Sequence, residues 1–434
     1  MISIAVRKIQ FQFLLIAVSL LYACTVFAQV PDSVYKSNIL TVRFHNYGDQ
    51  LSLPLINLNA GDQVELHFDD LEGGVKYYYY TYQLCDHDWI PVNLSEFDYL
   101  KGFTQMRISN YRNSSLSFTR YTHYQAILPE RNCIPSRSGN YLVKVFLDGD
   151  TSKLVFTRRL LVLENKSTIK AQVIQPFSPE YFRTHQKVQF SININGINAF
   201  SANQDIKVVI LQNYRWDNAI ANIAPTFIRG SSLEYNTEDN SVFQGGKEWR
   251  WLDIRDFRLQ SDRVQSGEYK KNSTDIYLKP DIPRSGERYT YYRDMNGMYL
   301  VATTQSINPF WQSDYGTVHF KFDLPNGKPY PDKDLYLFGQ LTNYKLTDSL
   351  KLRYNSEKGI YETKLLLKEG YYNYTFLAVD KANPHRGYEL DGDYYETENT
   401  YTILVYYRSF TARSDELIGV STIDTRTDKP GFSF

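Results

Sequence analysis

Hydrophobic and polar residues alternate along many short stretches of this 434-residue chain, a pattern that is typical of half-buried β-strands. The clearest example is Val64, Leu66 and Phe68, in which each apolar residue is followed by a polar or acidic one. A turn rich in glycine and acidic residues comes next, and residues 75–84 then form a tyrosine-rich strand pattern. Two such patterns separated by a turn predict an antiparallel hairpin.

A second hairpin is predicted where residues 141–146 and 154–163 flank the tight-turn sequence Asp148-Gly149-Asp150. Further strands are predicted at 172–175, 188–194, 206–212, 289–292, 298–303, 317–322, 335–339, 359–365, 370–376 and 401–407. A long polar passage, 236–288, interrupts them, and we find no helical periodicity beyond the N-terminus. The predicted fold class is therefore all-β: tandem antiparallel β-sandwich domains, immunoglobulin-like or early-set in type, after a signal peptide.

The N-terminus has the order of a secretory signal peptide. Arg7 and Lys8 precede an apolar run over 9–23, and small residues follow, so cleavage after Ala28 is expected. An alternative is lipidation at Cys24, which we favour less because Tyr22 is bulky for a lipobox. Either route exports the chain, and the signal-peptide route predicts a periplasmic protein.

Composition shifts and turn clusters divide the chain into regions. The predicted regions are a signal peptide at 1–28, an N-terminal β-sandwich at 29–165, a middle β-rich domain at 166–315, a C-terminal early-set-like β-sandwich at 316–412 and a polar tail at 413–434.

The charge balance argues against nucleic acid as a partner, because 48 basic residues face 48 acidic ones. The 37 tyrosines suit strand surfaces and also protein interfaces, where an apolar ring and a polar tip are both useful. Two cysteines remain after cleavage, Cys85 and Cys133. An exported compartment permits a disulfide between them, but the apolar residues beside each cysteine favour free, buried thiols.

No motif predicts catalysis: the sequence has no nucleophile elbow, no zinc-protease histidine pair and no phosphate-binding glycine loop. The cluster Cys85-Asp86-His87-Asp88 offers metal-ligand types, but neighbouring residues on a strand point to opposite faces. Asp253 and Asp256 lie among arginines and favour a surface salt-bridge cluster, and Asp391 and Asp393 flank a turn glycine. We predict no enzyme, no cofactor, no metal and no small-molecule substrate.

The third region resembles early-set modules that bind starch or glycogen. Residues 335–339, Asn343-Tyr344 and 370–376 carry this likeness. Those modules stack sugars on exposed tryptophan, whereas this region has Tyr344 and no tryptophan. Envelope glycan binding therefore stays as the alternative function, because a shared fold does not carry a shared function.

An ordered set of segments resembles one family across nearly all of the mature chain, the plug proteins of the type IX secretion system. The segments are Leu51–Pro54, Phe68–Leu71, Tyr78–Tyr80, Cys85–Trp89, Tyr99–Phe103, Tyr121–Tyr124, Ser138–Val145, Phe243–Arg250, Asp253–Arg255 and Ser313–Phe320. His87 and Trp249 depart from the family pattern, where a small residue and phenylalanine are expected.

The resemblance implies a non-catalytic periplasmic protein, peripheral to the outer membrane, that closes the wide β-barrel translocon when no cargo is engaged. The expected partner is therefore that translocon. Aromatic and arginine residues dominate protein interfaces. The residues predicted to bind the partner are Tyr78, Tyr80, Trp89, Trp249, Arg250, Trp251 and Arg255. Alternation along a strand predicts that about half of the tyrosines at 77–80 are instead core residues.

Overall fold

The computed structural model describes residues 30–271, 273–383 and 387–428. The predicted signal peptide at 1–28 and the alternative lipidation site, Cys24, lie outside the described residues. The described residues from Asp32 onward form one compact unit. Within the described residues, α2 and α3 have four residues each, and no helix there is long and apolar enough to cross a membrane.

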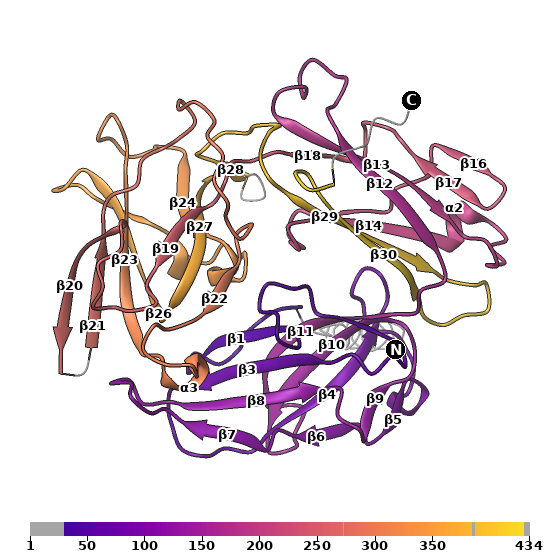
Figure 1. The fold of residues 1–434 in the computed structure, drawn as a ribbon, viewed down its shortest axis with the longest axis horizontal. Helices are drawn as coiled ribbons and strands as arrows, with labels where there is room; N and C mark the ends of the chain where they lie inside the picture. Colours follow the sequence, from indigo (N-terminus) through magenta and orange to yellow (C-terminus); the bar gives the residue numbers. More distant parts are fainter. Residues whose placement is uncertain (1–29, 272, 384–386, 429–434) are drawn as a thin grey trace, which may run out of the picture. The chain divides into compact units, whose positions relative to one another are not determined.

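The first sandwich packs two sheets around a core of alternating apolar residues (Figure 1). One sheet has the order β1 (Ile39–Asn46), β3 (Val64–Asp70), β8 (Thr122–Leu128) and β7 (Asn110–Asn113). The other has the order β2 (Leu55–Asn57), β11 (Leu154–Leu163), β10 (Gly139–Leu147), β4 (Tyr78–Cys85) and β6 (Gln105–Arg107). The helix η1 (Glu96–Asp98) precedes a ribbon of β5 (Leu100–Gly102) and β9 (Cys133–Pro135). Val64, Leu66 and Phe68 enter the core, as their alternation predicts.

A second sandwich has one sheet of contiguous chain and one that recruits the C-terminus. The first contains β12 (Thr168–Ile174), β13 (His185–Asn193), β17 (Ser232–Tyr235), β16 (Phe227–Arg229) and β18 (Val242–Gln244). The second has the order β15 (Ile220–Ala221), β14 (Ile206–Gln212), β29 (Thr400–Tyr407) and β30 (Glu416–Asp424), and Figure 1 shows the last three side by side. The helix α2 (Ala202–Asp205) leads into β14.

The third sandwich is centred on the long strand β27 (Gly370–Asp380). This strand pairs with β19 (Arg250–Asp253), β22 (Tyr299–Val301), β24 (Lys333–Phe338) and β28 (Gly387–Glu389). The second sheet has the order β20 (Val264–Lys270), β21 (Ser273–Leu278), β23 (Tyr315–Asp323), β26 (Ile360–Lys368) and β25 (Arg353–Asn355). The short helices are α3 (Pro309–Gln312), η2 (Gln340–Thr342) and η3 (Asp348–Leu350).

These sheets confirm the all-β sandwich class, but strand pairing does not stop at the predicted region boundaries. Strands β19 to β22, placed by the sequence in the middle domain, pair within the third sandwich. The polar tail predicted from residue 413 is corrected by the structure, because β30 pairs with β29 and buries Leu417 and Ile418 completely. Its flanking charged residues masked this apolar pair in the sequence.

Two smaller strand predictions also change. The polar passage 236–288 contains four strands, β18 to β21, and residues 289–292 form no strand. In β19, Arg250 occupies a core position through ion pairs, so hydrophobic alternation does not reveal the strand. The prediction of free, buried thiols is confirmed for Cys85 and Cys133.

Candidate functional site

The face of the β1–β3–β8–β7 sheet that points away from the core carries an unusual group of titratable side chains. Val64, Leu66 and Phe68 point into the core, so the intervening residues of β3 point the other way. Strand register places His45 opposite Glu65, and His123 opposite Asp69. We call this group the histidine face: His45, Glu65, His67, Asp69 and His123. It gathers three of the seven histidines in the sequence, and all three are buried.

One end of the histidine face is a buried ion pair between Asp69 and Lys368, which are 1% and 0% exposed. The Lys368 ammonium donates to Asp69 Oδ2 at 2.6 Å, and the Tyr315 hydroxyl donates to the same oxygen at 2.5 Å. His123 Nδ1 lies 2.7 Å from Asp69 Oδ1. Burial raises the pKa of Asp69, but Lys368 and the hydrogen bond from His123 outweigh that effect and leave the pKa below its usual value. The carboxylate is therefore ionised and holds three donors.

The ionised Asp69 fixes the hydrogen positions of the histidines. His123 must donate from Nδ1 to Asp69, so its Nε2 accepts from Nδ1 of His67 at 3.2 Å. His45 donates from Nδ1 to the carbonyl of Asn46 at 2.9 Å. Nε2 of His45 and Nε2 of His67 are consequently lone-pair acceptors, and both are buried without a hydrogen-bond partner among the described residues. Burial lowers the pKa of each of these two histidines to about 4, so both are neutral near pH 7.

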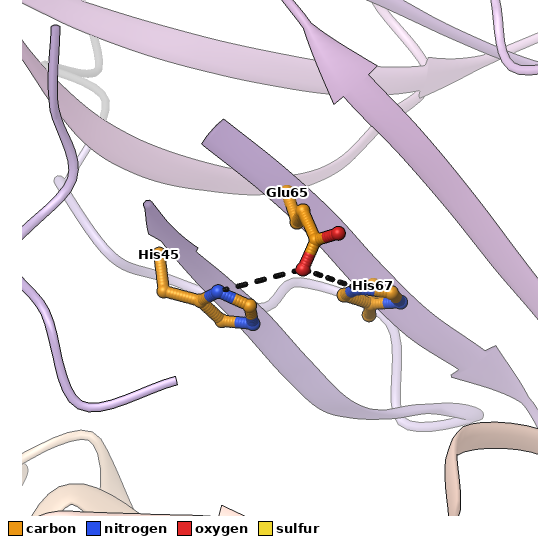
Figure 2. A group of neighbouring side chains, drawn as sticks. All are labelled: His45, Glu65 and His67. Carbon is orange, nitrogen blue, oxygen red and sulfur yellow. Dashed lines mark ion pairs between the residues drawn. The ribbon is translucent and has the colours of Figure 1, made fainter. Parts of the chain in front are cut away.

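The Glu65 carboxylate lies between the two imidazoles, as Figure 2 shows. Its Oε2 is 3.9 Å from His45 Nδ1 and 3.7 Å from His67 Nε2. One possible ligand atom from each of the three residues lies within 4.8 Å of the others, and among the described residues this is the one group of at least three such side chains that could hold a metal ion. The Glu65 side chain is 15% exposed and forms the open side of the group.

The histidine face is covered by residues of the third sandwich. Phe310 of α3 stacks on His67, with ring centroids 3.8 Å apart and an angle of 1° between the planes. The carboxylate of Asp314 accepts hydrogen bonds at 2.9 Å from the backbone amides of Phe118 and Thr119. Arg43 donates to Gln340 at 2.6 Å. Polar groups of the two sandwiches therefore satisfy each other across a partly buried contact.

A second contact joins the turn after β4 to the C-terminal strands. Backbone and side chain of His87 both bond to Asp415, at 2.8 and 2.9 Å, and Asp415 also accepts from Arg408 at 2.6 Å. Nearby, the Tyr406 hydroxyl donates to Asn140 at 2.9 Å. Burial lowers the pKa of His87, but the hydrogen bond and charge of Asp415 outweigh it, so the pKa lies above its usual value.

This contact predicts a pH dependence. Folding raises the pKa of His87. The stability that protonated His87 contributes to the folded state is therefore complete below the ordinary value of 6.5 and is lost as the pH rises through the folded-state pKa. We expect His87→Gln to lower the free energy of unfolding more near about pH 6 than near about pH 9. Urea unfolding at both values measures the difference. A cost that is the same at both values would contradict the assignment.

The structure places five of the seven predicted partner-binding residues in the interior. Tyr78, Tyr80, Trp89, Trp249 and Arg250 are all at most 8% exposed. Half of the tyrosines at 77–80 are core residues, as alternation predicts, but the two chosen for partner binding are the buried ones. Trp251 is half-buried and Arg255 is exposed, so these two are the accessible members of the set, and the role of the set in binding stays a prediction.

Arg250 is the centre of a second buried ion network. Its guanidinium donates to Asp281 at 2.9 Å and to Asp391 at 2.6 Å, and Arg284 also pairs with Asp391 at 2.7 Å. Asp391, interpreted from the sequence as a turn residue, is 1% exposed and serves this network. At the surface, Arg255 forms a two-pronged pair with Asp253, as the salt-bridge interpretation expects.

Tyr344 stands where the sugar-binding early-set modules have an exposed aromatic residue, but here it packs against other side chains. Tyr344 packs against Trp249 and Phe338, and Arg215 lies over its ring at 5.6 Å from the centroid. The ring faces therefore contact protein side chains. No observation here favours the glycan-binding alternative.

Sequence reasoning did not single out the histidine face. The signal that was available is the spacing Glu65, His67 and Asp69, which puts three titratable residues on one side of a strand whose other side is apolar. The contributions of His45 and His123 depend on strand register, and that of Lys368 depends on contacts 299 residues apart.

The chain is similar to one protein family model and to a solved structure. The family model described as "Type 9 secretion system plug protein 1st domain" matches residues 39–164. A crystal structure of a hypothetical protein from Parabacteroides merdae is similar along the chain, with 31% identity and a TM-score of 0.86. The alignment covers 91% of this chain and 99% of that one. A search of curated proteins finds no match.

Proposed function

Because this chain belongs to the type IX secretion system plug protein family, we propose that it closes the periplasmic mouth of the outer-membrane β-barrel translocon when no cargo is engaged. The observation that carries the proposal is the match of the family's first domain to residues 39–164, which contain β1 to β11 of the first sandwich. The family consists of secretion-system plug proteins and is not an enzyme family. Its association with type IX secretion indicates work at the cell envelope. The proposed plug acts by binding alone, as a periplasmic protein peripheral to the outer membrane.

Buried contacts between the sandwiches support this role. A plug must hold its shape against a wide pore, and interfaces that are not locked allow domains to move. Here Asp69 bonds to Lys368, Tyr406 bonds to Asn140, and both pairs are buried. Such contacts favour a body that binds with little rearrangement, which lowers the entropy lost on association.

The partner can be identified directly. The full chain, carrying an affinity tag, is incubated with detergent-solubilised outer membrane, and the proteins that co-elute are identified by mass spectrometry. We expect one very large β-barrel protein in near-stoichiometric amount. Recovery of other envelope complexes without any such barrel would contradict the proposal.

Closure of the pore predicts a permeability defect. Cells that lack this protein should admit a large hydrophilic antibiotic that the intact outer membrane excludes, and expression of the full chain should restore exclusion. Cells that lack both the protein and the barrel are the control, since without the pore there is nothing to leak. Equal uptake with and without the protein in barrel-containing cells would contradict a plug.

Arg255 offers a first test of the contact surface. Arg255→Glu reverses an exposed charge, and breaking its surface pair with Asp253 costs at most about 1 kcal/mol of stability. Arg353→Glu makes the same charge change at the exposed first residue of β25. If Arg255 lies in the contact, only its variant reduces barrel recovery. Equal recovery with both variants would remove Arg255 from the contact surface.

A further inference from the structure

We propose that His45, Glu65 and His67 form a binding site for one divalent transition-metal ion of the zinc type, on the polar face of the first sandwich. The site goes beyond the plug function and does not rest on it. It also reverses the expectation of no metal, which rested on sequence motifs alone.

The spacing of the ligand atoms fits such an ion after a small adjustment. Ligand atoms that bind zinc tetrahedrally at about 2.0–2.2 Å lie about 3.4 Å from one another. The carboxylate oxygen of Glu65 is already 3.7 Å from His67 Nε2, and the possible ligand atoms of the three residues, one from each, lie within 4.8 Å of one another. Movements of about 1 Å would therefore complete three bonds, which rotation of the side chains about χ1 and χ2 supplies.

The hydrogen bonds behind the ligands are those that metal sites use. A ligating histidine commonly donates its other ring N–H to a carbonyl or, through a relay, to a carboxylate. His45 donates to the carbonyl of Asn46, and His67 donates to His123, which donates to Asp69. The relay fixes His67 with its Nε2 lone pair toward Glu65. Because Nδ1 of His45 carries the hydrogen, the lone pair of His45 is at Nε2, which is buried and without a hydrogen-bond partner among the described residues.

The buried nitrogen of His67, Nε2, is the independent sign that a ligand is missing from the site. A buried polar atom without a partner costs about 1–3 kcal/mol, and native proteins rarely leave one without a reason. The histidine face contains two such atoms, and both side chains are more than nine-tenths buried. A cation bound beside Glu65 would satisfy His67 Nε2, which lies 3.7 Å from the Glu65 carboxylate, because the ion accepts the lone pair of the imidazole.

The charges around the site select the kind of ion. Two imidazoles and one carboxylate suit zinc, nickel or copper, whereas calcium and magnesium require more oxygen ligands. Arg43 is the nearest cation from β1, but its guanidinium is directed to Gln340, to the carbonyl of Gln50 and to the ring of Tyr299. Lys368 is occupied by Asp69. Three protein ligands leave a fourth position on the exposed side of Glu65, where water completes the shell.

The test uses the full mature chain with a tag that contains no histidine. After dialysis against a chelator and then against chelator-free buffer, the protein is titrated with CoCl2 and followed by visible absorption, and with ZnCl2 by calorimetry. We expect one ion per chain, the intense visible bands of four-coordinate cobalt, and displacement of cobalt by zinc. Absence of these bands from the folded wild-type protein would overturn the proposal.

Variants assign the ligands. Glu65→Gln and His67→Gln each remove one ligand and should weaken cobalt binding at least about 10-fold, and His123→Gln, behind His67, should weaken it about 10- to 100-fold. The control variant is His319→Gln. His319 lies on β23, outside the site, and pairs with Asp275 of β21, so this variant should bind cobalt as tightly as the wild type does. Circular dichroism confirms that each variant is folded. Binding that survives both ligand variants, or that His319→Gln abolishes, would overturn the assignment.

If one of the ligand variants fails to fold, thermal melting of the wild type decides the matter. An ion that binds the folded state raises the melting temperature in proportion to the logarithm of its free concentration. We expect this rise with zinc for the wild type and for His319→Gln. A melting temperature that zinc leaves unchanged would count against the site.

Discussion

A chain that ends at Ala412, and so lacks the segment that looks like a polar tail, is expected not to fold stably. The missing strand β30 contributes Leu417 and Ile418, which are fully buried, and Ile423, which is 8% exposed. Burial of each such side chain is worth about 1.5–3 kcal/mol, and the sum approaches the 5–15 kcal/mol by which typical proteins are stable. Loss of β30 also exposes the whole edge of β29, to which it pairs from Thr400 to Tyr407.

The matched control is a chain that ends at Asp428, which retains all of β30. Both chains are purified and melted while circular dichroism is recorded. We expect a cooperative transition for the longer chain and either none or one at least about 15 °C lower for the shorter chain, given the size of the lost core. Equal melting temperatures would show that β30 contributes nothing to the fold.

The second large effect is expected from Lys368→Met, which removes the partner of the buried Asp69. The substitution keeps most of the side-chain volume but leaves a carboxylate in the interior with only Tyr315 and His123 as donors. Breaking a buried pair on one side typically costs about 3–5 kcal/mol, because the remaining charge is uncompensated. The pKa of Asp69 should rise accordingly, because the positive charge that holds it low has gone.

Urea unfolding measures this cost in free energy, and two further variants of the protein show whether the buried pair is its cause. The double variant Asp69→Asn with Lys368→Met removes both charges and should be more stable than Lys368→Met alone. Lys358→Met breaks an exposed pair with Glu362 in the same strand region and should cost less than about 1 kcal/mol. If Lys368→Met cost no more than Lys358→Met, the buried pair would not hold the two sandwiches together.

The sequence predicted best those elements in which burial follows alternation. Val64, Leu66 and Phe68 lie in the core, and the tyrosines at 77–80 alternate between core and surface. It failed where a core position is polar. Arg250 is buried through ion pairs with Asp281 and Asp391, residues that lie 31 and 141 positions away. No local pattern reports such partners, so the sequence indicates only a polar passage where the structure has strand β19.

The candidate site was less predictable for the same reason. Exposure of an aromatic residue depends on what the rest of the chain places on it, and Trp89 and Trp249 are covered by segments distant in sequence. Arg159 and Trp216 lie against Trp89, for example. The polar side of β3 was visible as a spacing, but its histidine partners came from β1 and β8 through strand register.

The return of the C-terminus to the middle sandwich has a consequence for how the chain is made. Asn213, just after β14, bonds to Thr400, which is 187 residues later. During synthesis from the N-terminus, β14 therefore emerges long before its neighbour β29 exists, and the backbone N–H and C=O groups that will pair with β29 stay unpaired meanwhile. Strands that pair with distant parts of the chain fold slowly, and their unpaired edges favour aggregation in the meantime. We expect a nascent chain stalled near residue 390 to be held by chaperones, and one that has passed β30 to be released from them.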